Sequence, residues 1–252
     1  MDSLATWRQE AMILWSGGCD STYALYQHAL TVPRTDPIRT VSISQGNIPN
    51  NECDKRARDK IEKWLAADGI VLNRIEVTIS NFQIGDRDGG LQQPLFWLAA
   101  AIPALHQNED LITGYIKSDD LFHHKSEFVE AFNQLILLSG GGSSKLLFPL
   151  EWSTKCDIIK YLRGTNNHNG ECLLDLCWWC EKTNYNLKPK DDPEPCGCCP
   201  SCLTHNIWQR ELDRLNKECS KVNPAKKVIN ETKKPKVKML QSKTKTRAAR
   251  IK

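Results

Sequence analysis

The chain has 252 residues, of which 40% are hydrophobic and 25% are charged, enough for one folded α/β domain with an appendage. No stretch reaches the roughly 18 apolar residues that a membrane span requires, and the first ten residues lack the apolar core of a signal peptide. We therefore expect a cytoplasmic protein with no membrane association. The net charge of +4 hides a division, because residues 221–252 carry twelve Lys and Arg and one acid, which leaves the preceding body acidic.

Strands and helices are predicted to alternate along the first two thirds of the chain. The predicted strands are residues 11–15, 38–44, 70–79, 111–116 and 146–150. The predicted helices are residues 20–30, 51–67, 94–105, 125–138 and 153–162, the last capped by Ser153. This alternation predicts a parallel sheet covered on both faces, with ligands bound at the carboxyl ends of the strands.

The turn Ser16-Gly17-Gly18-Cys19-Asp20-Ser21 joins the first strand to its helix. Such a turn leaves unpaired backbone N–H groups at a helix N-terminus, where the macrodipole favours an anion such as pyrophosphate. The two glycines let an anion approach the backbone, and the two serines offer hydroxyls to phosphate oxygens. Asp20 could help to hold Mg²⁺. No lysine follows the glycines, so the turn is not a GK[ST]-type P-loop.

Seven of the eleven cysteines lie between Cys172 and Cys202. Without a secretory signal, this clustering favours a metal site over a disulfide framework. The run CGCCPSC at residues 196–202, with Cys180 upstream, suits four thiolates around one structural zinc ion. An iron–sulfur cluster is the alternative metal centre. From spacing alone, Cys177 could replace Cys180, and Cys198 could replace Cys199.

The string SGGCDS resembles the SGGxDS signature of the PP-loop ATP pyrophosphatases, which cleave ATP between its α and β phosphates. Together with the cysteine run, it resembles the QueC family of 7-cyano-7-deazaguanine synthases over roughly residues 11–215. The resemblance implies a Rossmann-like PP-loop fold with a C-terminal zinc subdomain. Matching the family's C…CGxCxxC motif selects four zinc ligands, which are Cys180, Cys196, Cys199 and Cys202.

The resemblance also implies roles for other residues. Residues 16–21 would bind the β,γ-pyrophosphate of ATP, and the strand end at Ile43 and Ser44 would lie beside the adenine. Asp119 matches the family's Gly-x-x-x-x-Asp segment and would hold Mg²⁺ or orient the nucleophile. Lys155 matches its "PL…tK" segment and would offset charge near the phosphates. Asp119 as a capping acid and Lys155 as a solvated helix residue are the alternatives.

Three segments depart from the family pattern. Gly85 to Gly89 keeps only a partial match to "PGRN", through Arg87, and residues 121–125 replace "YPDCR". The substrate-pocket candidates are therefore Arg87, His123, His124 and Lys125, although both histidines could be solvated loop residues. Fifteen residues separate Cys180 from Cys196, a longer spacer than is usual. Because the first two departures lie on the substrate side, the resemblance implies adenylation more directly than it implies the identity of the acid.

The reaction implied by the resemblance is that of an ATP-dependent ligase. The carboxylate of 7-carboxy-7-deazaguanine is adenylated, ammonia displaces AMP to give an amide, and a second round dehydrates the amide to a nitrile. One alternative attaches the deazaguanine acid to a protein amine, as in bacterial antiviral defence. Another is a PP-loop tRNA-modifying thiolase that uses Cys19 or an iron–sulfur cluster. A non-enzymatic zinc module that binds nucleic acid is the last alternative.

The predicted organisation is a PP-loop domain at residues 1–165, a four-cysteine zinc subdomain with a helix at 166–220, and a basic tail at 221–252. The tail has few large apolar residues and a like-charge excess, so we expect it to be disordered in isolation. It could bind nucleic acid or an acidic protein, or remain solvated. The family resemblance suggests a homodimer.

Overall fold

The computed structural model describes residues 10–45, 50–79, 92–140, 142–180 and 194–222, and every structural statement below refers to these residues. The chain divides into two compact units, Met1–Leu212 and Asp213–Lys252. The first unit contains the sheet and the sites described below. The predicted domain boundaries at 165 and 220 stay predictions. None of the described helices is both long enough and apolar enough to span a membrane.

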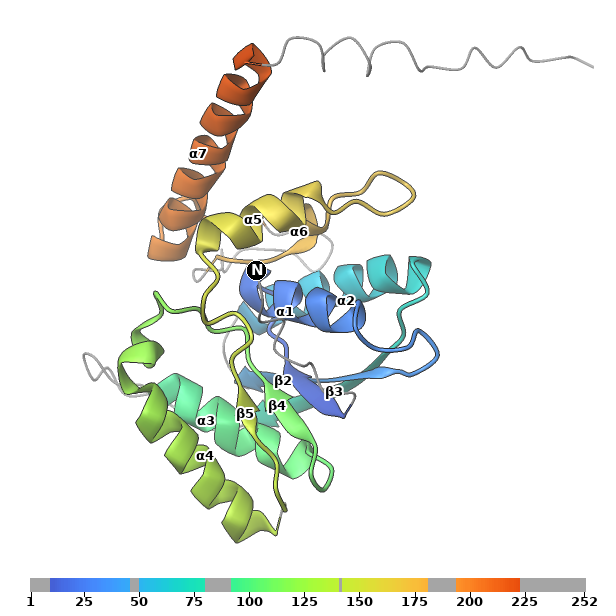
Figure 1. The fold of residues 1–252 in the computed structure, drawn as a ribbon, viewed down its shortest axis with the longest axis vertical. Coiled ribbons are helices and arrows are strands. Elements are labelled where there is room, and N and C mark those ends of the chain that lie inside the picture. The colour runs from blue at the N-terminus through green and yellow to red at the C-terminus, as the bar shows by residue number, and fades with distance from the viewer. Residues whose placement is uncertain (1–9, 46–49, 80–91, 141, 181–193, 223–252) are drawn as a thin grey trace, which may run out of the picture. The chain divides into compact units, whose positions relative to one another are not determined.

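Five parallel strands form a single sheet with the order β3-β2-β1-β4-β5 (Figure 1). The strands are β1 Ala11–Leu14, β2 Ile38–Gln45, β3 Leu72–Ile79, β4 Asp110–Ile112 and β5 Leu146–Leu147. The chain moves outward from β1 through β2 to β3, and then returns to the other side of β1 to form β4 and β5. The strand order therefore reverses at β1, where open α/β sheets bind their ligands. This topology confirms the predicted Rossmann-like parallel fold.

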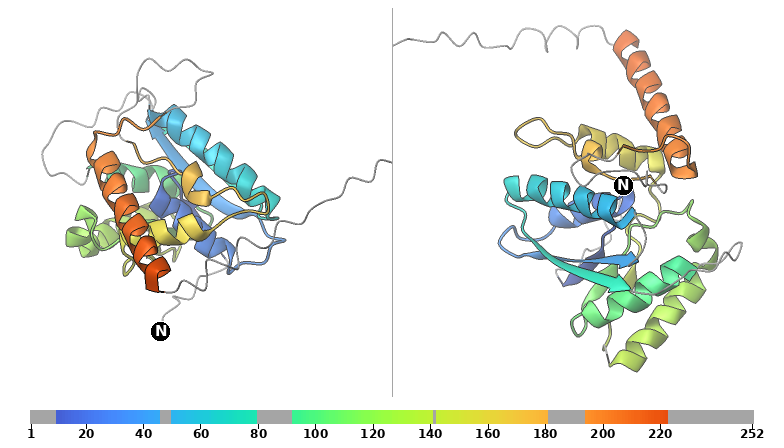
Figure 2. Two further views of the ribbon diagram at one scale, coloured as in Figure 1. Left: turned by 90° about the horizontal axis from the view of Figure 1, so that it is seen from above. Right: turned by 180° about the vertical axis from the view of Figure 1, so that it is seen from behind.

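Helices cover both faces of this sheet (Figures 1 and 2). Within the first core cluster, α1, α2 and α5 pack on β1 through side chains that include Ile13, while α3 and α4 pack on the other face around Met12. Adjacent residues of β1 thus serve opposite cores, as strand geometry requires. The helices are α1 Cys19–Ala29, α2 Asn50–Ala67, α3 Gln92–Ala101, α4 Lys125–Ser139, α5 Lys155–Gly164, α6 Leu173–Leu176 and α7 Pro200–Val222, with 3₁₀ segments η1 Ile102–Ala104 and η2 Asp120–His124.

Some predicted boundaries were wrong. Strand β4 ends at Ile112 rather than at residue 116, because the chain then turns and Ile116 N donates to the carboxylate of Asp119 at 2.8 Å. Helix α5 is capped by Thr154 rather than Ser153. Thr154 Oγ1 accepts from Asp157 N at 3.2 Å and the Asp157 carboxylate accepts from Thr154 N, which makes a capping box. The predicted loop at 81–90 lies outside the described residues.

Candidate active site and metal centre

A cavity of about 410 Å³ lies at the point where the strand order reverses. Its walls come from the carboxyl ends of β1, β2 and β4, the start of α1, and α3. The lining residues are Leu14, Trp15, Ser16, Gly18, Asp20, Ser21, Ile43, Trp97, Gly114, Tyr115 and Asp119. The structure therefore brings together four of the six predicted PP-loop residues, the predicted adenine-side Ile43 and the predicted catalytic Asp119.

The first two carbonyl groups of the PP-loop (residues 16–21) accept hydrogen bonds from residues that do not line this cavity. Ser16 O accepts from Arg58 Nη1 and Gly17 O accepts from Trp178 N, both at 3.0 Å. Gly18 is the N-cap of α1, and no side chain caps it. The first N–H groups of α1, with the positive end of its macrodipole, are thus left at the cavity wall, which is the arrangement that binds phosphate.

Two glycines are required for this geometry. Gly17 has a positive φ of 89°, and a Cβ added there would lie 3.0 Å from both Arg58 Cγ and Asp54 O. A Cβ on Gly114 would lie 2.7 Å from the backbone N and Cα of Ser21. Gly114 therefore lets the segment after β4 pack directly against the first turn of α1.

An ion pair lies beside the PP-loop. Lys155, at the start of α5, donates from Nζ to Asp20 Oδ2, while Asp20 Oδ1 is buried and accepts no hydrogen bond from the described residues. Burial lowers the pKa of Lys155, but the carboxylate of Asp20 outweighs it, with help from Cys19 and Asp119, so the pKa lies above its ordinary value. Lys155 is therefore a cation between acids, and Asp20 keeps one oxygen available for a metal ion.

Asp119 holds a backbone turn through its carboxylate and also lines the cavity. It is the N-cap residue of η2, and its Oδ2 accepts from Ile116 N at 2.8 Å. It also lines the cavity. Asp119 thus occupies the N-cap position, but its side chain makes no capping hydrogen bond to η2 and instead holds the turn that begins at Ile116.

Cys19 points into the protein core and does not line the cavity. It is 3% exposed and belongs to the same buried cluster as Cys177. A hydrogen bond from Cys177 lowers the pKa of Cys19 against the effect of burial, and His205 and Lys155 add to this, while the pKa of Cys177 is raised well above its ordinary value. The two thiols are thus a hydrogen-bonded pair within the core, away from the cavity.

The remaining candidates do not line the cavity. Ser44 lies within β2, paired with Thr78, and His123 and His124 are exposed in η2. Lys125 Nζ forms an ion pair with Glu151 and lies over the rings of Phe122 and Phe148, so it holds η2 against the segment after β5. Arg87 lies outside the described residues.

The sequence analysis did not identify three residues at this site. Trp97 and Tyr115 line the cavity, and within the described residues neither Trp97 Nε1 nor the Tyr115 hydroxyl has a hydrogen-bond partner, although both atoms are buried. Burial also raises the pKa of Tyr115, so the phenol stays protonated. Arg58, 2% exposed, holds Ser16 O from beneath and pairs with Glu76 at 3.0 Å. Of these three residues, only Tyr115 lay within a motif, the Gly-x-x-x-x-Asp segment that begins at Gly114; Trp97 and Arg58 belonged to none.

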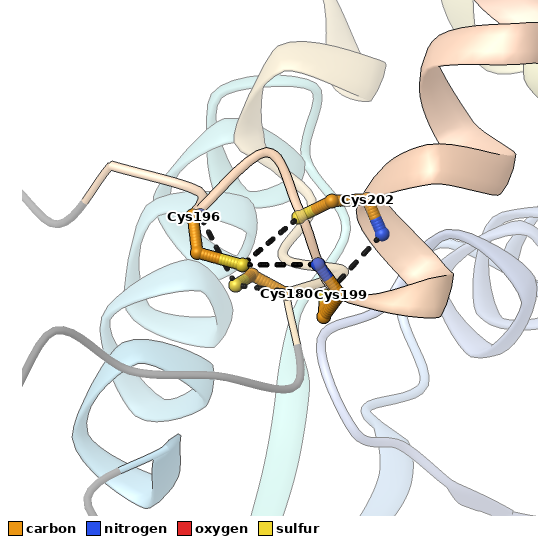
Figure 3. A group of neighbouring side chains, drawn as sticks. All are labelled: Cys180, Cys196, Cys199 and Cys202. Carbon is orange, nitrogen blue, oxygen red and sulfur yellow. Dashed lines mark hydrogen bonds between the residues drawn. The ribbon is translucent and has the colours of Figure 1, made fainter.

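Four cysteine side chains converge on one point beside the start of α7 (Figure 3). They are Cys180, Cys196, Cys199 and Cys202, and their sulfur atoms all lie within 4.8 Å of one another. Sulfurs bound tetrahedrally to one zinc at about 2.3 Å would be roughly 3.8 Å apart, so this separation fits a single ion. The structure thus assembles the predicted ligand set. Of the alternatives, Cys177 lies in the core, whereas Cys198 Sγ lies 3.6 Å from Cys196 Sγ but is not one of the four sulfurs that all lie within 4.8 Å of one another.

Backbone N–H groups favour thiolates in this cluster. Cys196 N donates to Cys180 Sγ and Cys199 N to Cys196 Sγ, each at 3.3 Å, and Cys202 N donates to Cys199 Sγ at 3.4 Å. Hydrogen bonds from the backbone at Cys198 and Cys199 lower the pKa of Cys196 to about 6. Burial and the neighbouring thiols raise the pKa of Cys202 to about 12. A bound cation would remove this conflict, because metal ligation deprotonates thiols.

Two comparisons with known proteins, one of structures and one of sequence families, found similar proteins. The solved structure of the U34-tRNA thiolase NcsA from Methanococcus maripaludis, with its [4Fe-4S] cluster, is 15% identical, with coverage of 98% of this chain and 81% of that chain and a TM-score of 0.41. That likeness is too distant to assign a reaction. The sequence model of the QueC family, described as queuosine biosynthesis protein QueC, matches residues 94–209. Together with the PP-loop before α1, the match supports an ATP-using enzyme of the PP-loop class. The resemblance to the QueC family is therefore confirmed over residues 94–209, which include Asp119, Lys155 and all four cysteines of the cluster.

Proposed function

We propose that this chain is a ligase that adenylates the carboxylate of 7-carboxy-7-deazaguanine and then transfers nitrogen to it. The observation that carries the proposal is the helix N-terminus of α1 at the cavity wall, with the Asp20–Lys155 pair beside it. This combination offers backbone N–H groups and a cation to a triphosphate, and a carboxylate to its metal ion.

In the proposed reaction, a substrate carboxylate oxygen attacks the α-phosphorus of ATP. The bond between that phosphorus and the β-phosphate oxygen breaks, and pyrophosphate leaves. Magnesium bound to the nucleotide neutralises phosphate charge and would be held by Asp20. The N–H groups at the start of α1 and the ammonium group of Lys155 stabilise the charge that accumulates on the leaving pyrophosphate. Ammonia then attacks the acyl carbon, and AMP leaves as the nitrogen loses a proton, which gives the amide. In the second round the amide oxygen attacks the α-phosphorus of another ATP and pyrophosphate leaves. AMP then departs with that oxygen, the nitrogen loses its two protons over this round, and the nitrile forms.

Other residues that line the cavity support a planar heteroaromatic acid as the substrate. Leu14 and Ile43 supply apolar surface, whereas Trp97 and Tyr115 hold buried polar atoms without partners among the described residues. An indole N–H can only donate, and a phenol can donate or accept. A ring that carries nitrogen or carbonyl acceptors would satisfy both groups, since buried polar atoms strongly favour pairing.

We also propose that the four-cysteine cluster binds one structural zinc ion. Four sulfurs within 4.8 Å of one another fit one central ion, whereas a cubane cluster binds each cysteine sulfur through a different iron and so holds the four sulfurs farther apart. A thiolase reading that uses Cys19 is also disfavoured, because no cysteine is among the described residues that line the cavity.

The test is incubation of the full chain with ATP, Mg²⁺, 7-carboxy-7-deazaguanine and ammonium, followed by mass spectrometry. We expect AMP, pyrophosphate, the amide and the nitrile. Lys155→Met should abolish AMP release, whereas Lys160→Met, an exposed position on the same helix, should not. AMP release only after a protein acceptor is added would redirect the same chemistry to a protein amine. No AMP with any acid, despite ATP binding, would refute the proposal.

A further inference from the structure

The segment Cys177–Cys180, here called the strap, contacts the PP-loop directly. Trp178 N donates to Gly17 O at 3.0 Å. On its other side, Trp178 O lies 3.3 Å from the position that a Cβ on Gly18 would occupy. The backbone of Trp178 therefore packs against both glycines of the PP-loop, and Trp178 does not line the cavity.

The other end of the strap belongs to the four-cysteine cluster. Cys180 supplies one of the four sulfurs, and Trp178 Nε1 donates to Cys180 O at 3.0 Å. Trp178 and Trp179 pack against the buried cysteines of the cluster. Trp179 also stacks on His205 of α7, with ring centroids 3.6 Å apart. The hydrogen bond to the PP-loop and a sulfur of the cluster thus come from residues only two positions apart in the sequence, Trp178 and Cys180.

We expect a metal ion at the cluster to stabilise the position of the strap. Without an ion, the cluster must hold four thiols together through weak N–H···S contacts, and any thiolates among them repel one another. Binding of a structural zinc ion contributes directly to the folding free energy of such a site. If the strap moves, Gly17 O loses its donor, and a carbonyl dipole that turns toward the cavity would oppose the binding of phosphate.

We propose that Trp178 is a positioning residue through which metal binding at the four-cysteine cluster tightens the binding of ATP at the PP-loop. This inference rests on the proposed function, since it requires that the PP-loop binds ATP. Coupling between two binding sites is reciprocal, so ATP must strengthen metal binding by the same factor. The cluster then has a role in nucleotide binding in addition to holding the fold together.

The first experiment measures both directions of the coupling with the full chain in reducing buffer. Calorimetry with Mg²⁺ and a non-hydrolysable ATP analogue compares zinc-loaded with chelator-treated protein, and circular dichroism checks that the fold persists. We expect at least tenfold weaker binding after zinc removal. The same analogue should slow the transfer of zinc to a chromophoric chelator. Equal affinity in two folded states overturns the coupling alone, whereas absence of binding to zinc-loaded protein overturns the proposed function as well.

A second experiment separates the strap from the metal itself. Trp178→Ala keeps all four ligands but removes the anchor to Cys180 O, so we expect one zinc per chain together with several-fold weaker binding of the ATP analogue. Trp152→Ala is the matched control, because that side chain is 75% exposed, its ring centroid lies 4.7 Å from the Lys117 ammonium, and it belongs to neither the strap nor the cysteine cluster. A Trp178→Ala protein that binds the analogue as tightly as the wild type overturns the proposal, even if chelation unfolds the wild-type chain.

Discussion

Replacement of Gly114 by alanine tests the packing that sets the PP-loop. The added Cβ would lie 2.7 Å from two backbone atoms of Ser21 and 2.9 Å from the carbonyl carbon of Asp20. These contacts must open to about 3.4 Å, the start of ordinary van der Waals contact. Because every obstructing atom is backbone, no side chain can rotate away, and either the segment after β4 or the first turn of α1 must move.

The expected cost follows from overpacking in a close-packed region, which is about 1–3 kcal/mol. For a chain of this size, each kcal/mol lowers the melting temperature by about 2–4 °C. The displaced residues are those that we expect to bind phosphate, so the affinity for Mg-ATP should fall by about tenfold for each 1.4 kcal/mol of misplacement.

Gly164→Ala is the matched control for this experiment. Gly164 ends α5, no heavy atom lies within 4 Å of the position that a Cβ would occupy there, and its φ is not in the positive range. Alanine there should leave ATP binding unchanged and the melting temperature equal or slightly higher. Calorimetry and thermal denaturation of both variants provide the measurement. A Gly114→Ala protein that binds Mg-ATP like the wild type would show that the contact between Gly114 and Ser21 does not set the nucleotide site.

Further predictions concern the metal, the ion pair and pH. Cys196→Ser should lower the zinc content, measured by atomic absorption, below one ion per chain. Purified wild-type protein should show no absorbance of an iron–sulfur cluster in the visible region. One such cluster per chain would contradict the zinc assignment. Lys155→Met should weaken pyrophosphate binding by about tenfold or more in calorimetry, since it removes a partly buried cation beside the phosphates, and unchanged binding would exclude its phosphate role. His28 is 1% exposed and burial lowers its pKa to about 4, so the folded state favours its neutral form. The contribution of neutral His28 to the free energy of unfolding should therefore be fully present above pH 6.5 and fall by about 3 kcal/mol as the pH drops toward 4. His28→Gln should flatten the dependence of the unfolding free energy on pH in this range. An identical slope in the variant would refute the role of His28.

The general architecture could be predicted because it depends on local pattern. Apolar runs followed by turn residues gave the five strands, and the alternation with helices gave a parallel sheet. The four clustered cysteines could be selected by the motif resemblance, and the structure gathers the same four sulfurs. In both cases the residues that matter lie close together in sequence or belong to a recognisable spacing.

The rest of the site could not be predicted because it depends on contacts between distant segments. Arg58 binds Ser16 O across 42 positions in the sequence, and Trp178 reaches Gly17 from beyond α6. Neither residue has a motif of its own. The placement of His123 and His124 also needed the structure, since alignment against a family segment cannot tell whether η2 presents its side chains to a cavity or to solvent.

The pairing of Lys155 with Asp20 affects which form of the nucleotide the protein accepts. Before any ligand arrives, the ammonium group neutralises the carboxylate, so neither charge is fully available to a newcomer. A divalent ion can take over the carboxylate and so release the lysine toward phosphate oxygens. ATP without a divalent metal ion would lie close to the Asp20 carboxylate, while the Lys155 ammonium stays paired with that carboxylate. We therefore expect the free protein to discriminate against metal-free ATP, a form of selectivity that arises from one ion pair.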